Sequence, residues 1–540
     1  MNHNFKLLTC GIAIIMALSF GSTFDYLKKT FPSIAKLTNQ ITNNNSNPPQ
    51  PAELPIAEYF DVLVYGDELP GICAAIWAKK ALGDSGRVAL VRSNAATEQL
   101  GGLLTRGGLA YLDFDKTYWY EQPAAQCFRN FLAKANIVEA CVEPNNADQA
   151  LKEMLAEAGV TIISDSPLTP YVANQEIQYV DVTESKIRFK ARSYIDATQD
   201  AQLAREAGLA YYQGYESQSP QLQNATLSVS IIPLITGLSI SELRSIEQQI
   251  IDDAELMANI ETSIREQQTP GLANFWLQDF YSPIYKAYLD GYFNRSIALG
   301  AAYHLNYNHP FNLDGFFFDK SNICVLPEDS LSLNGLLFKY PVTQQRQIEA
   351  NGLKPTQEMM TEMVNFEAWL QDISGKDNVQ VIIPPEVYIR HTLSIKDVIN
   401  PLTGQEIIQG GTKPEDSIGS FSYEFDLRGG VKGLSGRIPS LPIFNFGIEH
   451  TLASKVNNLA IVSRSSGYVG MAVSVGRIQT VNVYQGQGVG VAAAIATQSD
   501  TPLNTITSVE VRETLEILTG LTTQFYGRDI TRGLDYSNIR

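Results

Sequence analysis

The alternation of apolar and polar segments near the start of the chain predicts a strand, a helix and a second strand. An apolar run at 60–65 ends at Gly66, Gly71 opens a helix of small residues at 72–82, and a second apolar run follows at 87–91. A glycine turn between a buried strand and a helix is typical of a dinucleotide-binding unit, because the helix N-terminus attracts a pyrophosphate.

Further along, the periodicity predicts strands and helices that alternate. The remaining predicted strands are 160–164, 176–182, 186–189, 192–197 and 458–462. The remaining predicted helices are 148–158, 239–266, 356–373 and 486–496. Between about 211 and 447 the predicted helices lie among aromatic-rich loops, where an inserted substrate domain is expected. With 540 residues, two interleaved domains are expected rather than one core.

The charge balance excludes two classes of partner. The chain has 57 acidic and 40 basic residues, a net charge of −17. Nucleic acids and anionic membrane surfaces are bound by basic patches, so we expect no nucleic-acid partner.

The N-terminus predicts export or membrane attachment. The apolar run at 7–20 follows Lys6 and fits the apolar region of a signal peptide, with an uncleaved anchor and a merely apolar N-terminus as alternatives. Residues 1–22 are therefore predicted to be a signal peptide or anchor, and the Asn- and Pro-rich residues 23–55 a disordered linker. The folded protein would be periplasmic, extracellular or held at the membrane.

The five cysteines show neither a CxxC pair nor metal-ligand spacing, so no metal site is predicted. In an oxidising compartment Cys127 and Cys141 could pair. The alternative is that the cysteines are separate buried thiols.

Four motifs stand in order along the chain: YGDELPG at 65–71, LGGLLT at 100–105, YIDATQD at 194–200, and a stretch at 458–490 that ends in GQGVG. A weaker fifth is YIRHTLSIKD at 388–397. Together they resemble the bacterial FAD-dependent oxidoreductases with a glutathione-reductase-like fold and a long inserted substrate domain. No CxxC pair follows the first motif, which argues against a pyridine-nucleotide disulfide reductase.

This resemblance implies an α/β fold: a Rossmann-like FAD-binding domain, three-layered with a mostly parallel sheet, and an inserted α+β substrate or cap domain. The implied divisions are 56–214 and 457–498 for the FAD-binding domain, 215–456 for the substrate domain, and 499–540 for a C-terminal segment. The implied cofactor-binding residues are Gly66, Asp67, Glu68, Gly71, Arg92, Gly101, Gly102, Asp196, Thr198, Asp200, Gly486, Gln487, Gly488 and Gly490.

Two of these residues depart from the motif. Glu68 replaces the glycine that admits the pyrophosphate, and a carboxylate about 4 Å from a phosphate costs about 1–4 kcal/mol. Arg92 replaces the acid that accepts hydrogen bonds from the ribose, and arginine has donors only. An arginine there also suits a 2′-phosphate, which leaves NADPH open. We also consider that Glu68 and Arg92 pair with each other.

The last motif predicts a helix that begins at Gly486. Its N-terminus would stabilise negative charge on a reduced flavin through free N–H groups and the helix dipole.

Candidates for substrate chemistry are Arg477, Arg390 and His391. Arg477 matches a family arginine that could hold a substrate carboxylate or hydroxyl, and His391 could transfer a proton. Leu393 and Ser394 replace two family arginines, and Gln199 replaces a glycine of the third motif.

The predicted function is FAD-dependent transfer of a hydride between a small organic substrate and flavin N5, with an unidentified electron acceptor. One alternative is a degenerate, non-catalytic relative that acts as an envelope binding protein. The other is an NADPH-dependent enzyme without flavin.

Overall fold

The computed structural model describes residues 56–93, 97–115, 117, 121–137, 140–164, 166–182, 186–268, 273, 277, 293–294, 297–312, 314–434 and 441–531. Ile56–Arg540 form one compact unit. The predicted leader and linker lie outside the described residues. Within the described ranges no helix has both the length and the apolar character needed to cross a membrane.

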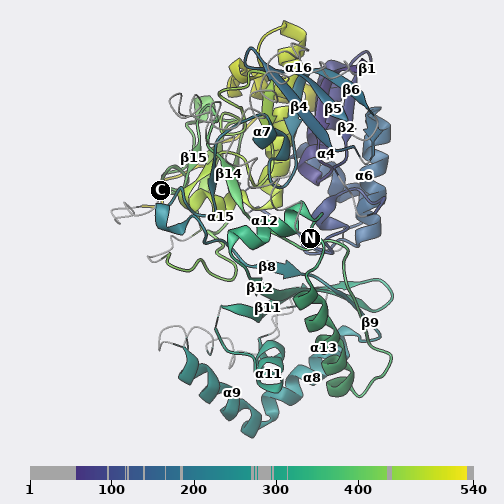
Figure 1. Ribbon diagram of the computed structural model, residues 1–540, viewed down its shortest axis with the longest axis vertical. Coiled ribbons are helices and arrows are strands. Elements are labelled where there is room, and N and C mark those ends of the chain that lie inside the picture. Colours follow the sequence, from purple (N-terminus) through teal and green to yellow (C-terminus); the bar gives the residue numbers. More distant parts are fainter. Residues whose placement is uncertain are drawn as a thin grey trace, which may run out of the picture. The chain divides into compact units, whose positions relative to one another are not determined.

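A seven-stranded sheet forms the centre of the first part of the chain (Figure 1). Its strands are β1 (Ile56–Tyr65), β2 (Val88–Val91), β3 (Thr161–Ile163), β4 (Leu168–Ala173), β5 (Glu176–Val182), β6 (Ile187–Asp196) and β18 (Leu459–Ile461). Their order is β3-β2-β1-β6-β5-β4, and β18 pairs with the C-terminal half of β6. All pairs are parallel except β4–β5 and β5–β6. The predicted α/β class is confirmed.

The second half of β1, residues 62–65, and all of β2 are apolar because both faces of the sheet are covered there. Val62 and Val64 face a core shared with the helices α4 (Leu69–Leu82) and α16 (Gln479–Ser499). Leu63 and Tyr65 face a second core shared with β5, β6 and the short helix α7 (Gln202–Glu206). A strand buried on both sides has no polar face to alternate with, as expected for a parallel sheet.

Three predicted elements differ in the structure. The two strands predicted at 186–189 and 192–197 are one strand, β6. The helix predicted at 239–266 is two helices, α8 (Ile240–Asp252) and α9 (Ala254–Gln267). The break occurs because the Asp253 carboxylate accepts hydrogen bonds from the backbone N–H groups of Glu255 and Leu256, which caps a new helix.

The third difference concerns the helix expected to begin at Gly486. Helix α16 begins at Gln479, so Gly486 and Gly490 lie in its interior. A Cβ on Gly486 would lie 2.3 Å from the carbonyl oxygen of Pro70, and one on Gly490 would lie 2.2 Å from that of Ala74. Glycines four residues apart share one face of a helix, so they let α16 pack backbone to backbone on α4.

The inserted part, defined here as residues 229–382, holds an antiparallel sheet with the order β10-β11-β12-β9-β13, and β8 also pairs with β12. Its strands are β8 (Val229–Ile231), β9 (Leu234–Thr236), β10 (Phe293–Asn294), β11 (Gly315–Leu326), β12 (Ser330–Lys339) and β13 (Gln380–Ile382). Helices α8, α9, α11 (Ala298–Asn306) and α13 (Gln357–Ser374) gather beside it (Figure 1). The long β11–β12 hairpin was missed by the sequence analysis, which expected loops there.

Two disulfides join segments far apart in the sequence. Cys73 of α4 bonds to Cys127 of α5 (Gln126–Lys134), and Cys141 bonds to Cys324 of β11. Both expectations for the cysteines were therefore wrong. Cys127 and Cys141 do not pair with each other, and four of the cysteines form disulfides instead of remaining free thiols. Sequence spacing alone does not determine connectivity.

The α4–α16 contact predicts that Gly490→Ala destabilises the fold. Alanine favours a helix by about 1 kcal/mol over glycine, yet its methyl group would force the two backbones apart. We expect a net loss of about 1–3 kcal/mol in the free energy of unfolding, measured by urea denaturation. Ser499→Ala, at an exposed site of the same helix, is the control. Equal or greater stability of Gly490→Ala would contradict the close contact.

Candidate active site

Three loops meet where the parallel strands end. Tyr65 at the end of β1 pairs with Asp196 of β6, and Asp196 pairs on its other side with Ile461 of β18. The loops that follow, 66–68, 197–200 and 462–466, are therefore neighbours. Ligands of open α/β sheets bind outside the carboxyl ends of the strands, so this edge is the candidate site.

A cavity of about 530 Å³ opens at this edge, a volume within the range of ligand pockets. Five of the predicted cofactor-binding residues line it: Gly66, Asp67, Glu68, Thr198 and Asp200. The helix α12 (Val342–Ala350) closes another side with Arg346 and Glu349. Other charged lining residues are Arg106, Arg205, Glu206 and Glu386.

The two glycines retained from the motif have steric roles. Gly66 has a φ of +117°, and a Cβ there would lie 2.5 Å from the carbonyl carbon of Ala197. A Cβ on Gly71 would lie 2.4 Å from the carbonyl oxygen of Gly66. The first glycine therefore permits the tight turn, and the last lets α4 pack against it.

Asp67 is the centre of a buried charge network. Its carboxylate accepts hydrogen bonds from the guanidinium groups of Arg92 (3.1 Å) and Arg106 (2.8 and 2.9 Å). Burial alone would raise the pKa of Asp67, but the two arginines lower it below its usual value. Arg106 also binds Glu386.

Arg92 does not line the cavity. It is 2% exposed, and besides Asp67 its guanidinium donates to the carbonyl oxygens of Thr97 (2.6 Å) and Gln99 (3.0 Å). The hypothesis that Glu68 and Arg92 pair with each other was wrong, because each has a different partner.

Glu68 binds Arg464 instead. The Arg464 guanidinium donates to both carboxylate oxygens of Glu68 at 2.9 Å, and it also donates to Oε1 of Gln199 at 2.8 Å. Arg464 lies in the loop after β18 and binds the carbonyl oxygen of Ile389 as well. Two of the three departures from the nucleotide motif, at positions 68 and 199, therefore share one partner.

Asp196 supports this edge from within the protein. Its carboxylate accepts hydrogen bonds from the backbone and hydroxyl of Thr198 (3.0 and 2.6 Å) and from the N–H of Ala204 (2.8 Å). Burial raises its pKa to about 6 although these hydrogen bonds oppose the shift. Asp196 does not line the cavity; Asp200 does, and it pairs with Arg205.

The remaining predicted cofactor residues lie away from the cavity lining. Gly101 and Gly102 have φ angles of +101° and +50°, and a Cβ on Gly102 would lie 2.6 Å from Cγ of Glu68. Gly486, Gln487, Gly488 and Gly490 lie inside α16. Gln487 accepts a hydrogen bond from the N–H of Cys127 and donates to the carbonyl oxygen of Pro123. The sequence predicted that this segment would begin a helix and stabilise negative charge on a reduced flavin. Residues inside a helix have no free N–H groups for that role.

Of the three substrate candidates, two meet at Tyr388. Arg477 donates to the Tyr388 hydroxyl at 3.1 Å and pairs with Asp426, while the Arg390 guanidinium lies 4.4 Å from the centre of the Tyr388 ring. Tyr388 in turn lines a narrow cavity at the N-terminal end of α16, with Asp113, Gln479 and Thr480 among its polar walls. At about 10 Å³ this cavity has room for about one water molecule.

Arg390 is a buried cation without a carboxylate partner in the described part of the chain. It donates to the carbonyl oxygen of Ser228 and to the hydroxyl of Ser230, and its Nε has no hydrogen-bond partner there. Burial lowers its pKa to about 9, so it stays charged at neutral pH.

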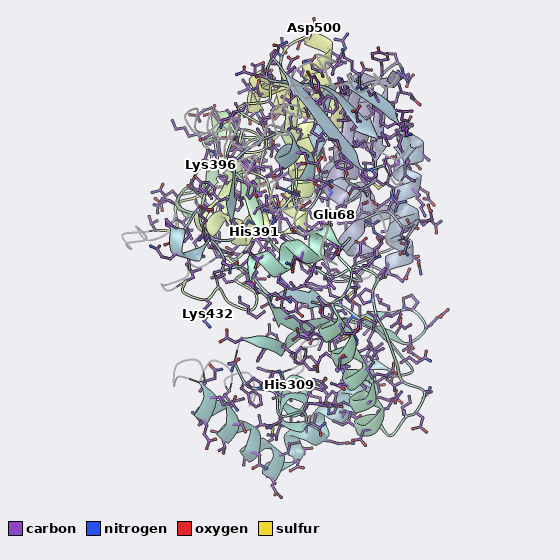
Figure 2. The ribbon with its side chains drawn as sticks, viewed as in Figure 1. Glu68, His309, His391, Lys396, Lys432 and Asp500 are labelled. Carbon is purple, nitrogen blue, oxygen red and sulfur yellow. A yellow bond between two sulfur atoms is a disulfide. The ribbon has the colours of Figure 1, made fainter. Side chains whose placement is uncertain are left out.

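His391 directly follows Arg390 in the chain but has different partners. It is fully buried, it contacts Ser394 at 2.9 Å and the ring of Tyr215, and burial lowers its pKa to about 3. A histidine with this pKa stays neutral near pH 7 and does not suit proton transfer there. In Figure 2 it lies apart from Glu68, and His309 lies farther away in the inserted part.

The profile of the FAD dependent oxidoreductase family matches residues 61–515 of the chain. The protein belongs to this family. It is therefore an FAD-dependent enzyme with FAD as its cofactor, and the family resemblance seen in the sequence motifs is confirmed. No curated protein matches the sequence.

Solved structures resemble the oxidoreductase only distantly. The myxobacterial chondrochloren halogenase CndH has 11% identity and a TM-score of 0.38, with 85% of this chain and 78% of that chain covered. The L-proline dehydrogenase from P. horikoshii has 9% identity and a TM-score of 0.37, with 87% and 100% covered. At these scores nothing about activity follows from either likeness.

The residues present fit FAD with one exception. The Gly66 turn, the N-terminus of α4 and the large cavity suit the adenosine and phosphate end of a dinucleotide. The exception is Glu68, whose side chain fills the space between that helix end and Gly102.

Sequence reasoning missed several residues of the site. Arg106, Arg346, Glu349, Glu386 and Arg464 come from loops or from α12, where nothing in the local pattern distinguishes them. For Arg464 the sequence did contain a signal. Its loop belongs to the last motif, and two glycine positions of the other motifs hold polar residues, Glu68 and Gln199, which require hydrogen-bond partners when buried.

Glu349 predicts a pH dependence of stability. Burial and the charge of Asp200 raise the pKa of Glu349 to about 8, from an ordinary 4.5. The folded state therefore holds this proton more tightly than the unfolded state, and its contribution to stability is lost as pH rises from 4.5 to 8. Between pH 6.5 and 8 we expect it to lower the free energy of unfolding by about 1 kcal/mol per pH unit, with the slope falling by about half as pH 8 is reached.

The test compares the unfolding of wild type and Glu349→Gln across this range. The glutamine can still accept from Thr392, as Glu349 does at 2.8 Å, but it carries no charge. Below pH 6.5 the buried histidines titrate in the unfolded state, which sets the lower limit of the range. An unchanged slope in Glu349→Gln would contradict the raised pKa.

Proposed function

We propose that this FAD-dependent enzyme removes a hydride from a small organic substrate that carries an anionic group, and passes the electrons to a separate acceptor. The observation that carries the proposal is the pair of buried guanidinium groups, Arg390 and Arg477, on either side of Tyr388. Arg390 has no carboxylate partner in the described residues. A buried cation without a counter-ion favours an anionic ligand nearby.

The residues that would hold FAD lie at the strand edge. Gly66, Thr198 and Asp200 border the large cavity, and Arg464 and the N-terminus of α4 supply positive charge for the phosphates. When bound, FAD supplies a two-electron acceptor that can take a hydride at flavin N5.

The residues that would bind the anionic group of the substrate, Arg477 and Arg390, lie around Tyr388. The narrow cavity that Tyr388 lines has room for about one water molecule, so a substrate needs more space than this cavity provides. Arg477 is buried and already donates hydrogen bonds to Asp426 and Tyr388, so a substrate carboxylate would compete with Asp426 for it. Leu69, Leu103 and Leu104 form an apolar wall of the narrow cavity, which holds no more than about one water molecule. An apolar wall strengthens the interaction of an anion with the arginines.

We propose further that the enzyme works outside the reducing cytoplasm, exported or anchored by its N-terminal segment. Two disulfides support this, because structural disulfides persist in oxidising compartments. The apolar run at 7–20 supports it independently.

The compartment proposal predicts the state of the thiols. Protein purified from its native envelope without reductant should resist alkylation at Cys73, Cys127, Cys141 and Cys324, and each should become reactive after reduction in denaturant. Mass spectrometry of the peptides identifies the pairs. Ready alkylation of all four in the unreduced, denatured protein would contradict both the pairing and the compartment.

The function predicts bound flavin that a substrate can reduce. The full-length protein should show a flavin absorbance spectrum and release FAD on denaturation, identified by mass. Small hydroxy and amino acids are then screened anaerobically for bleaching of that spectrum. For a substrate found in this way, Arg477→Met should raise KM by about tenfold or more, as expected for a lost charge-assisted hydrogen bond, and Arg477→Lys should raise it less.

The matched control is Arg512→Met, at a half-buried site on α17 (Ser508–Thr519), where the guanidinium donates to the carbonyl oxygen of Pro414. A folded protein that neither contains FAD nor can be reconstituted with it would contradict the proposed FAD-dependent function. Bleaching by neutral alcohols alone, unaffected by Arg477→Met, would contradict the anionic substrate.

A further inference from the structure

The residues that replace the two motif glycines, Glu68 and Gln199, share one binding partner, Arg464. Glu68 stands where a glycine would admit the pyrophosphate, and Gln199 stands where a glycine ends the third motif. Arg464 binds both, with its guanidinium 2.9 Å from the two carboxylate oxygens of Glu68 and 2.8 Å from Oε1 of Gln199. The substitutions therefore form one structural unit rather than two separate losses.

The Glu68 carboxylate lies beside the N-terminal end of α4 and binds Arg464. Glu68 is the N-cap residue of α4, yet its side chain makes no capping hydrogen bond to the helix. It extends toward Gly102 instead, where a Cβ would lie 2.6 Å from its Cγ. Its side chain is 8% exposed and that of Arg464 is 5% exposed, so both charges are removed from water.

Each surrounding group would serve a phosphate equally well. A helix N-terminus attracts anions, a guanidinium group binds carboxylate and phosphate oxygens alike, and a left-handed glycine such as Gly102 lets a ligand approach the backbone. The cavity of about 530 Å³ begins at Glu68 itself, which is one of its lining residues.

We propose that the Glu68 carboxylate is an internal substitute for the cofactor's pyrophosphate. FAD then binds by exchange: Glu68 turns toward the cavity, and Arg464 passes from the carboxylate to a phosphate. No covalent bond changes in this step. The proposal rests on the FAD-dependent function proposed above, and it makes Arg464 the phosphate-binding residue and Glu68 its intramolecular competitor.

The competition has a measurable consequence. Removing the carboxylate should strengthen FAD binding, because the cofactor no longer displaces an ion pair and no longer meets a like charge. The same change should create a site for inorganic pyrophosphate, a ligand that reports on the phosphate position without a flavin.

The experiment uses the full chain, freed of nucleotide, in four forms: wild type, Glu68→Gly, Glu68→Gln and Glu362→Gln. Glycine is tolerated at an N-cap, and glutamine keeps hydrogen-bonding groups for Arg464 should the glycine variant fold poorly. Glu362 is a matched control, a buried glutamate of the inserted part that contacts His309 at 3.1 Å. FAD affinity is measured by calorimetry, and pyrophosphate binding by the shift in Tm.

We expect both Glu68 variants to bind FAD at least about tenfold more tightly than wild type and Glu362→Gln. We also expect 5 mM pyrophosphate to raise the Tm of the Glu68 variants only, and Arg464→Met added to Glu68→Gln to abolish that rise. Equal FAD affinity in all forms, or weaker binding by the Glu68 variants, would overturn the exchange while leaving the FAD-dependent function intact.

Failure of the function itself has a different signature. If every form is folded and none binds FAD, the proposed function fails. A pyrophosphate-dependent rise in Tm confined to the Glu68 variants would then still support the internal substitute, and its absence would overturn that as well.

Discussion

The pairing of β1 with β6 ends with Tyr65 beside Asp196, and the rest of the site depends on this register. It brings the glycine turn of the first strand next to the loop after β6, and β18 adds the loop that carries Arg464. A shift of one residue would turn the buried side chains of β1 to the opposite faces of the sheet. The packing of β1 into the cores on both faces of the sheet therefore also determines which loops meet at the strand ends.

Charges at that edge are held by partners from distant parts of the chain. Asp67 lies among Arg92 and Arg106, and Glu68 lies against Arg464, all of them nearly inaccessible to water. Removal of one partner from such a buried pair leaves an uncompensated charge, which is costly. Each departure from the nucleotide motif therefore has a partner elsewhere in the fold: Arg92 binds Asp67, and Glu68 and Gln199 bind Arg464.

The sequence contained enough to predict six of the seven strands of the central sheet, all but β4, together with the first glycine turn and five residues of the cavity lining. These follow from local signals: apolar runs, glycine positions and the residues directly after a strand. It was not enough to predict the start of α16, because a glycine that opens a helix and one that packs against another helix look alike. The partners of Glu68 and Arg92 lie hundreds of residues away or among polar loop residues, where only the fold reveals them.

The bond between Cys141 and Cys324 acts as a covalent tether between the nucleotide-binding half and the inserted part, across a sequence separation of 183. A hinge that swings the inserted part away from the sheet would have to strain or break this bond. Movements that admit a ligand to the site must therefore keep Cys141 and Cys324 bonded to each other. In a reducing compartment this bond would be reduced, and the two parts would lose their covalent connection.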